Sequence, residues 1–88
     1  MRSVVIFKEF ENQVISATYR NLMIGAKVVL VDVNGIALSE PVACITSPAP
    51  NGTVRIRLPA VFKPGTYYLR ALNGHGAGVA ESAAFSIG

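Results

Sequence analysis

Residue types that commonly build active sites are scarce in this chain, which has 88 residues but only one His, one Cys and no Trp. A single Cys excludes an intrachain disulfide. A nucleophilic Cys needs a base beside it and a metal site needs three or four ligands, yet His75 and Cys44 stand far apart among few acids. The sequence therefore predicts no catalytic residue, no metal site and no cofactor. We expect Cys44 in the core as a small apolar residue and His75 in an exposed loop.

Charge is also sparse, because charged residues make up 15% of the chain where a soluble domain typically has about 25%. The eight basic residues, which give a formal net charge of +3, are scattered along the sequence, whereas nucleic-acid-binding domains gather them on one face. The apolar run from Val4 to Phe7 ends at Lys8, far short of the about 18 residues of a membrane span. We expect neither a nucleic-acid nor a membrane partner, and synthesis in the cytoplasm.

Apolar residues form 51% of the chain and lie in short segments separated by turn-forming residues. Regularly spaced Gly, Pro and Asn clusters are typical of an all-β sandwich or barrel. Asn34-Gly35, between Val33 and Ile36, predicts a two-residue hairpin turn, because both residues tolerate positive φ. The sequence predicts seven strands, at residues 3–10, 13–20, 26–33, 42–47, 53–58, 66–73 and 79–87.

Alternation of apolar and polar side chains predicts which strand faces are buried. In segment 53–58, Val54 and Ile56 alternate with Arg55 and Arg57, so we expect the arginines to face water. The same pattern predicts two further inner rows, Tyr67, Leu69 and Ala71 in one strand and Ala83, Phe85 and Ile87 in another.

Segment 10–24 leaves a helix open as an alternative to a strand. The apolar residues with approximately helical spacing are Phe10, Val14, Ala17 and Ile24. Gly25 is suited to follow a helix end. The pairs Val14-Ile15 and Thr18-Tyr19 are rich in β-branched and aromatic residues and favour a strand instead.

The segment from Phe62 to Gly74 combines a Pro-Gly turn with a strand that contains Tyr67, and the segment from Glu81 to Ile87 follows with an apolar-x-apolar pattern. This arrangement resembles the late strands of immunoglobulin-like and fibronectin-type-III-like modules of bacterial and viral (phage) surface proteins. The resemblance implies one domain over residues 1–88 with an all-β fold, a single seven-stranded antiparallel immunoglobulin-like β-sandwich. It also implies that Tyr67 is the corner tyrosine of that family, whose hydroxyl bonds to nearby backbone.

These features together predict a non-catalytic structural or assembly module that binds other proteins or copies of itself. By analogy with small phage modules, we expect a capsid decoration or particle accessory protein, located at a virion surface or outside the cell. The alternative is an extracellular adhesion or carbohydrate-binding domain of a larger protein. Gene neighbours or binding to glycans would separate the two.

Two segments carry apolar side chains on both faces, although a sandwich core buries one face of each strand. In residues 4–10, Val4 and Ile6 oppose Val5 and Phe7, and in residues 26–33 the row of Val28 and Leu30 opposes a row of valines. We therefore predict a partner interface that contains five residues, Val4, Ile6, Val28, Leu30 and Tyr68. The alternative is that a segment such as 36–50 covers this surface within the monomer.

Overall fold

The computed structural model describes residues 2–87, and for residues 39–41 it describes the backbone alone. All regular structure in these residues is β-strand, in eight strands with no helix. The helix alternative for residues 10–24 is therefore wrong. The strands are β1 (Val4–Glu11), β2 (Val14–Arg20), β3 (Lys27–Asp32), β4 (Ala37–Cys44), β5 (Gly52–Arg57), β6 (Gly65–Leu72), β7 (Gly78–Glu81) and β8 (Phe85–Ile87).

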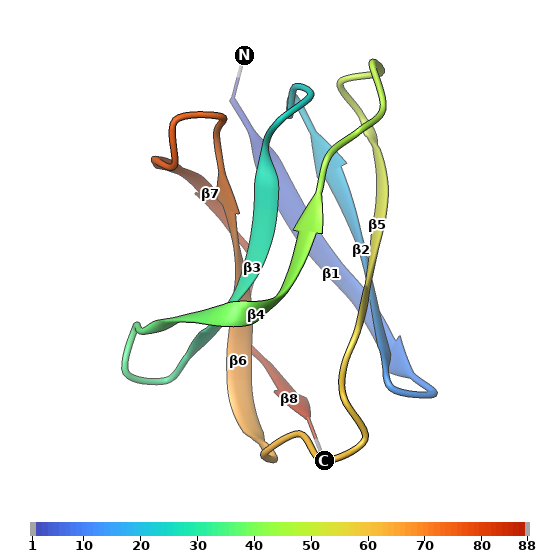
Figure 1. Cartoon of the computed structure of the whole chain (residues 1–88), viewed down its shortest axis with the longest axis vertical. Coiled ribbons are helices and arrows are strands. Elements are labelled where there is room, and N and C mark those ends of the chain that lie inside the picture. Colours follow the sequence, from blue (N-terminus) through green and yellow to red (C-terminus); the bar gives the residue numbers. More distant parts are fainter. Residues whose placement is uncertain (1, 88) are drawn as a thin grey trace.

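The strands form two antiparallel sheets that pack face to face. The smaller sheet has the order β1-β2-β5, and the larger has the order β4-β3-β6, with β7 and β8 both paired to β6. Figure 1 shows β3 and β4 in front and the paler β1 and β2 behind them. The loops β2–β3, β4–β5 and β6–β7 lie at one end, and the β1–β2, β3–β4 and β5–β6 connections lie at the other.

The core between the sheets is entirely apolar in the part of the chain that the structure describes, with no buried polar or charged side chain. The predicted row of Tyr67, Leu69 and Ala71 is buried, and Val54 and Ile56 are buried between the exposed Arg55 and Arg57. These two rows of the prediction are confirmed. Phe7 of β1 and Phe85 of β8 stack with their ring centroids 4.0 Å apart, which joins the two sheets.

The β1–β2 hairpin explains why residues 10–24 are not helical. Asn12 and Gln13 both have positive φ, at 53° and 66°, which is the conformation of a two-residue turn of type I′. The turn places Phe10 opposite Ile15 and Glu11 opposite Val14. Such turns usually contain Gly, so Asn12 and Gln13 give no clear signal of a turn in the sequence.

The predicted strand 79–87 is interrupted at residues 82–84, so the described residues contain eight strands where we expected seven. The Ser82 hydroxyl accepts a hydrogen bond from the Leu69 backbone N–H at 2.9 Å, and the Ser82 N–H donates to the Leu69 carbonyl at 2.8 Å. Because a side-chain oxygen replaces a backbone carbonyl in the ladder, the chain leaves β6 and rejoins it at Phe85, opposite Tyr67. Ala83 is consequently exposed, contrary to the predicted inner row.

Both faces of β3 are covered within the monomer, which accounts for its two apolar rows. Val28 and Leu30 are fully buried in the core, and Val29 and Val31 are buried on the other face. On that face Val29 lies opposite Arg70 and Val42. Val29 pairs with Val42 but Val31 pairs with Ala37, so β4 has four residues, 38–41, opposite the single residue Leu30. At this irregularity β4 changes direction sharply (Figure 1).

The assignment of faces in β5 can be tested with two neighbouring substitutions. Ile56→Ala should lower the free energy of unfolding by about 2–5 kcal/mol, because it leaves a cavity in a packed core. Arg55→Ala should change it by less than about 0.5 kcal/mol, because that side chain is exposed. Urea unfolding followed by fluorescence or circular dichroism measures both values, and equal losses would contradict the assignment.

Candidate protein-binding surface

The β3–β4 turn presents two exposed apolar side chains on a fixed backbone. Oδ1 of Asp32 accepts hydrogen bonds from the backbone N–H of Asn34 at 2.9 Å and of Ile36 at 3.0 Å. Asp32 and Ile36 also pair through the backbone, and only Gly35 of the turn has positive φ, at 79°. The connection is therefore a three-residue loop with a bulge, and the predicted two-residue turn at Asn34-Gly35 is wrong. Val33 remains 70% exposed and Ile36 61% exposed.

The same arrangement recurs in the β6–β7 loop. Oδ1 of Asn73 accepts hydrogen bonds from the backbone N–H of His75 at 2.9 Å and of Ala77 at 3.0 Å, and Gly76 has a φ of 85°. The amide oxygen of Asn73 therefore accepts the same pair of backbone hydrogen bonds in this loop as the carboxylate oxygen of Asp32 accepts in the β3–β4 turn. In both loops one short polar side chain satisfies two backbone donors, so the loop needs no contact with the core to hold its shape.

The β5–β6 connection is held by Tyr67. Its hydroxyl donates a hydrogen bond to the carbonyl of Lys63 at 2.8 Å, which confirms the predicted bond from this hydroxyl to nearby backbone. The ring of Phe62 packs against the Tyr67 ring with centroids 5.3 Å apart. Val61, just before Phe62, is 95% exposed. The connection therefore holds an apolar side chain in water on an anchored segment.

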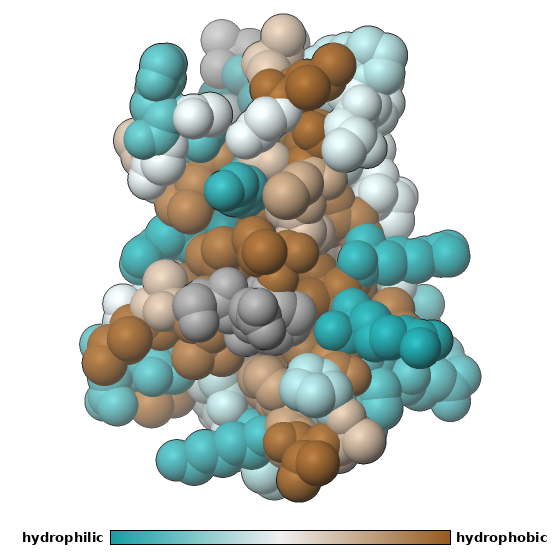
Figure 2. All heavy atoms as spheres, viewed as in Figure 1, coloured by the Kyte–Doolittle hydropathy of each residue, from teal (hydrophilic) through white to brown (hydrophobic). Residues whose placement is uncertain are grey.

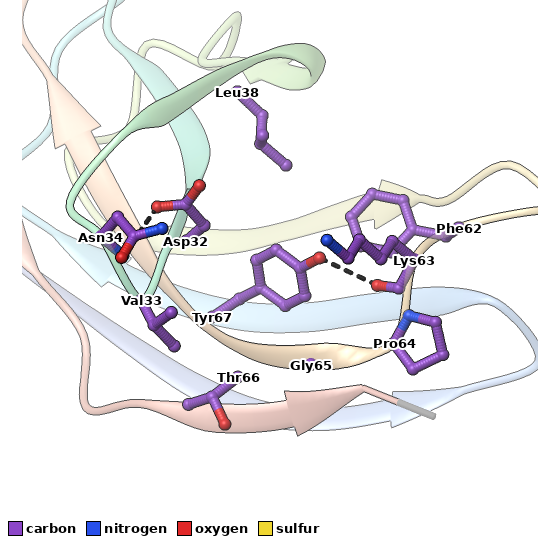
Figure 3. A pocket seen from close by; sticks show the side chains of 10 residues that line it. All are labelled: Asp32, Val33, Asn34, Leu38, Phe62, Lys63, Pro64, Gly65, Thr66 and Tyr67. Carbon is purple, nitrogen blue, oxygen red and sulfur yellow. Dashed lines mark hydrogen bonds between the residues drawn. The ribbon is translucent and has the colours of Figure 1, made fainter.

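A groove of about 400 Å³ lies between these two connections (Figure 3). Figure 3 shows the Tyr67 hydroxyl directed at the Lys63 carbonyl and the Asp32 side chain directed at the backbone of Asn34. The groove is largely apolar, with one acid and one base, and its main lining residues are Asp32, Val33, Leu38, Phe62, Lys63 and Pro64. Figure 2 shows apolar atoms on the surface at the β3–β4 turn and at the lower end of the molecule. We call this region the end groove.

The structure separates the five residues predicted to form an interface. Val28 and Leu30 are fully buried and cannot contact a partner, so including them was wrong. Their row faces the opposite sheet and belongs to the core cluster between the sheets. The alternative that part of the chain itself covers residues 26–33 is the correct one.

Val4 and Ile6 lie on the outer face of the smaller sheet, where Val4 is half-buried and Ile6 is 44% exposed. Ile6 lines a shallow hollow of about 640 Å³ together with Lys8, Thr18 and Arg20. The sequence prediction missed the end groove, because exposure of Val33 and Val61 depends on loop geometry and not on strand alternation.

Tyr68 lies on the outer face of the larger sheet and is half-buried. Its hydroxyl accepts a hydrogen bond from Nη2 of Arg70 at 3.1 Å, and Nε of Arg70 donates to Oε2 of Glu81 at 2.9 Å. The Glu81 carboxylate raises the pKa of Arg70 above its ordinary value. Tyr68 is therefore engaged in a side-chain cluster that the end groove does not include.

The residues considered for chemistry do not come together. His75 is exposed in its loop, as predicted. Cys44 is exposed, so its predicted place in the core is wrong. It lies opposite Lys27 on the outer side of β4, because its neighbour Ala43 pairs with the inward-facing Val28. Among the described residues, no three His, Cys, Asp or Glu side chains are grouped closely enough to hold a metal ion.

No protein-family model matches the chain, and no curated protein matches its sequence. In the described part of the chain, no helix has the length and apolar character needed to cross a membrane.

The role of Asp32 predicts a difference between two substitutions. Asp32→Ala should destabilise the fold by about 1–2 kcal/mol, because two backbone donors lose their partner. Asp32→Asn should stay within about 0.5 kcal/mol of the wild type, because Asn73 makes the same two bonds in the β6–β7 loop. Thermal or urea unfolding decides between them, and a loss of similar size in both variants would show that the charge matters and not the hydrogen bonds.

Tyr67 and Tyr68 provide a second matched pair. Tyr67→Phe should cost about 1 kcal/mol of unfolding free energy, because it leaves the Lys63 carbonyl without its donor. Tyr68→Phe should cost less than about 0.5 kcal/mol, because Tyr68 is only half-buried and Arg70 keeps its bond to Glu81. Urea unfolding measures both, and a smaller effect at Tyr67 than at Tyr68 would contradict the anchoring role of Tyr67.

Proposed function

We propose that this chain is a non-catalytic structural or assembly module that binds another protein through the end groove. The observation that carries the proposal is the end groove itself. The turn anchored by Asp32 holds Val33 in water at one wall, and the connection anchored by Tyr67 supplies Phe62 to the other wall, with Val61 exposed in the preceding position. Rigidly presented apolar side chains around a concave surface are typical of protein interfaces, because binding then orders few groups. Exposed apolar groups gathered at one place mark interaction sites on soluble domains.

The proposed fold type is an immunoglobulin-like sandwich, close to the fibronectin-type-III arrangement. Three observations support it: the sheet orders β1-β2-β5 and β4-β3-β6 with β7 and β8, the crossing from one sheet to the other between β5 and β6, and the Tyr67 bond at that crossing. With β7 and β8 counted as one interrupted strand, the number of strands also agrees with the seven of such domains. This fold carries many functions, so it supports a binding role without naming the partner.

A capsid decoration role remains the more specific form of the proposal. A carbohydrate-binding role has less support, because sugar platforms need exposed planar rings. All seven aromatic side chains are buried or half-buried: Phe7, Phe10, Tyr19, Phe62, Tyr67, Tyr68 and Phe85.

Affinity capture with matched variants tests the proposal. The tagged wild type and the double variant Val33→Ser/Val61→Ser are incubated with lysate of the source organism, and retained proteins are quantified by mass spectrometry. We expect at least one protein to be retained about tenfold less by the double variant, because exposed apolar anchors carry much of an interface's energy. Both side chains are largely exposed, so stability should be unchanged. The matched control is Thr46→Ala in the β4–β5 loop, an exposed residue that does not line the groove, and it should retain the same protein as the wild type does.

Identification of the protein that depends on Val33 and Val61 then tests the capsid form of the proposal directly. A glycan array run with the same variants tests the carbohydrate alternative. The proposal is wrong if the double variant retains every protein as well as the wild type does, or if the chain binds glycans through surfaces that these substitutions leave intact.

A further inference from the structure

The end opposite the end groove carries a second exposed apolar feature, at the apex of the β2–β3 loop. Met23 is 66% exposed and Ile24 is 61% exposed. Figure 2 shows apolar atoms at this loop, at the upper end of the molecule. We call Met23 and Ile24 the apolar tip. A shallow hollow of about 210 Å³ lies beside it, lined by Met23, Asn73, Gly74 and Val79 among others.

Hydrogen bonds on both sides fix the loop that carries the apolar tip. The Leu22 N–H donates to the Pro50 carbonyl and the Gly25 N–H to the Ile45 carbonyl, both at 3.0 Å. Leu22 itself is buried and anchors the loop in the core. The apolar tip is therefore presented by a held backbone, so little conformational entropy is lost when a partner binds it.

Three basic residues lie at the end of the fold that carries the apolar tip. Arg20 and Lys27 are exposed at the two ends of the loop. Arg2 is exposed nearby, since its neighbour Ser3 donates a hydrogen bond to the Asn21 carbonyl at 2.9 Å. Of the other basic residues, Arg70 is paired with Glu81, and Lys63 lines the end groove together with Asp32.

The described acids lie elsewhere in the fold. Glu9 and Glu11 lie toward the β1–β2 turn, opposite Ser16 and Val14. Asp32 lies at the far end of β3 from Lys27, and Glu81 is paired with Arg70. No acid whose side chain the structure describes therefore neutralises Arg2, Arg20 or Lys27.

From this arrangement we infer that the apolar tip and its three cations bind an acidic protein surface, one that offers carboxylates around an apolar depression. This inference rests on the proposed protein-binding function and gives the module a second docking surface of different chemistry. The cations steer an acidic partner and exclude basic ones, and the apolar tip supplies the buried contact at the centre.

A protein surface fits this site better than an anionic membrane does. A single myristoyl chain gives only marginal, reversible membrane binding, and the two side chains of the apolar tip bury less apolar surface than that chain. The hollow beside Met23 and Val79 can also receive a side chain of a partner, which a lipid surface would leave unused.

Selection from a displayed library of random 12-residue peptides tests the inference without knowledge of the natural partner. The immobilised wild-type chain should enrich peptides that combine several Asp or Glu residues with a large apolar residue. A synthetic copy of an enriched peptide, measured by fluorescence anisotropy, should bind Met23→Ser/Ile24→Ser at least about tenfold more weakly. Binding should weaken by a similar factor in Arg20→Gln/Lys27→Gln and in the wild type between 50 and 300 mM salt, because surface charges are screened.

The controls separate this inference from the proposed function. Val33→Ser/Val61→Ser and Lys63→Gln alter the end groove and should bind the acidic peptide as the wild type does. Thermal unfolding verifies that all variants are folded. The inference is overturned if the enriched peptides are not acidic, if the end-groove variants lose binding while the tip variants keep it, or if vesicles with 30% phosphatidylserine bind the tip and the peptides do not. Self-association that is lost in Met23→Ser/Ile24→Ser would overturn it in favour of a second copy as the occupant.

Discussion

Strand β3 is held on every side: β4 and β6 bond to its two edges, Val28 and Leu30 pack into the core, and Val29 and Val31 are buried on the other face. A strand fixed in this way also fixes the position and direction of both its ends. One end leads back into the loop that carries the apolar tip, and the other leads into the turn that forms one wall of the end groove. The two candidate binding surfaces are therefore held at opposite ends of one rigid strand, and their separation follows from the burial of its four central side chains.

Polar side chains in this protein stabilise connections and not the core. The core is apolar throughout the described residues, whereas Asp32, Asn73, Ser82 and the Tyr67 hydroxyl each bond to backbone in a turn or a strand break. A small domain that buries a limited surface gains from this division, because an unpaired polar group in the core would cost more than a loop bond contributes. The division also explains how loops that contribute little to the core can present exposed apolar side chains in defined positions.

The regular parts of the fold follow from the sequence, and the departures have local causes. The alternation of apolar and polar residues predicts the buried rows of β5 and β6, because each of these strands has one solvent-exposed face. It fails at residues 82–84, where a serine hydroxyl replaces a backbone carbonyl, and at Cys44, whose direction depends on how Ala43 pairs with Val28. The interface prediction recognised that β3 is apolar on both faces, but sequence alone does not show whether a partner or the same chain covers the second face. The exposure of Met23, Ile24, Val33 and Val61 does not follow from alternation, because all four residues lie in connections. The loop of Met23 and Ile24 is held by bonds to residues far away in the sequence, and the connections of Val33 and Val61 are held by local bonds.

The two ends of the molecule differ in a way that bears on what the module can join. The end groove is concave and is lined by one acid, Asp32, and one base, Lys63, so it offers no net charge to the three cations around the apolar tip. Oδ1 of Asp32 is already engaged with two backbone donors. When one end of a chain is complementary to the other end of the next copy, the copies can assemble into open filaments. Here the end groove carries no net negative charge that would attract the cations near the apolar tip. Discrimination between partners depends on such mismatches as much as on attraction. The two proposed surfaces therefore complement two different partners better than they complement each other.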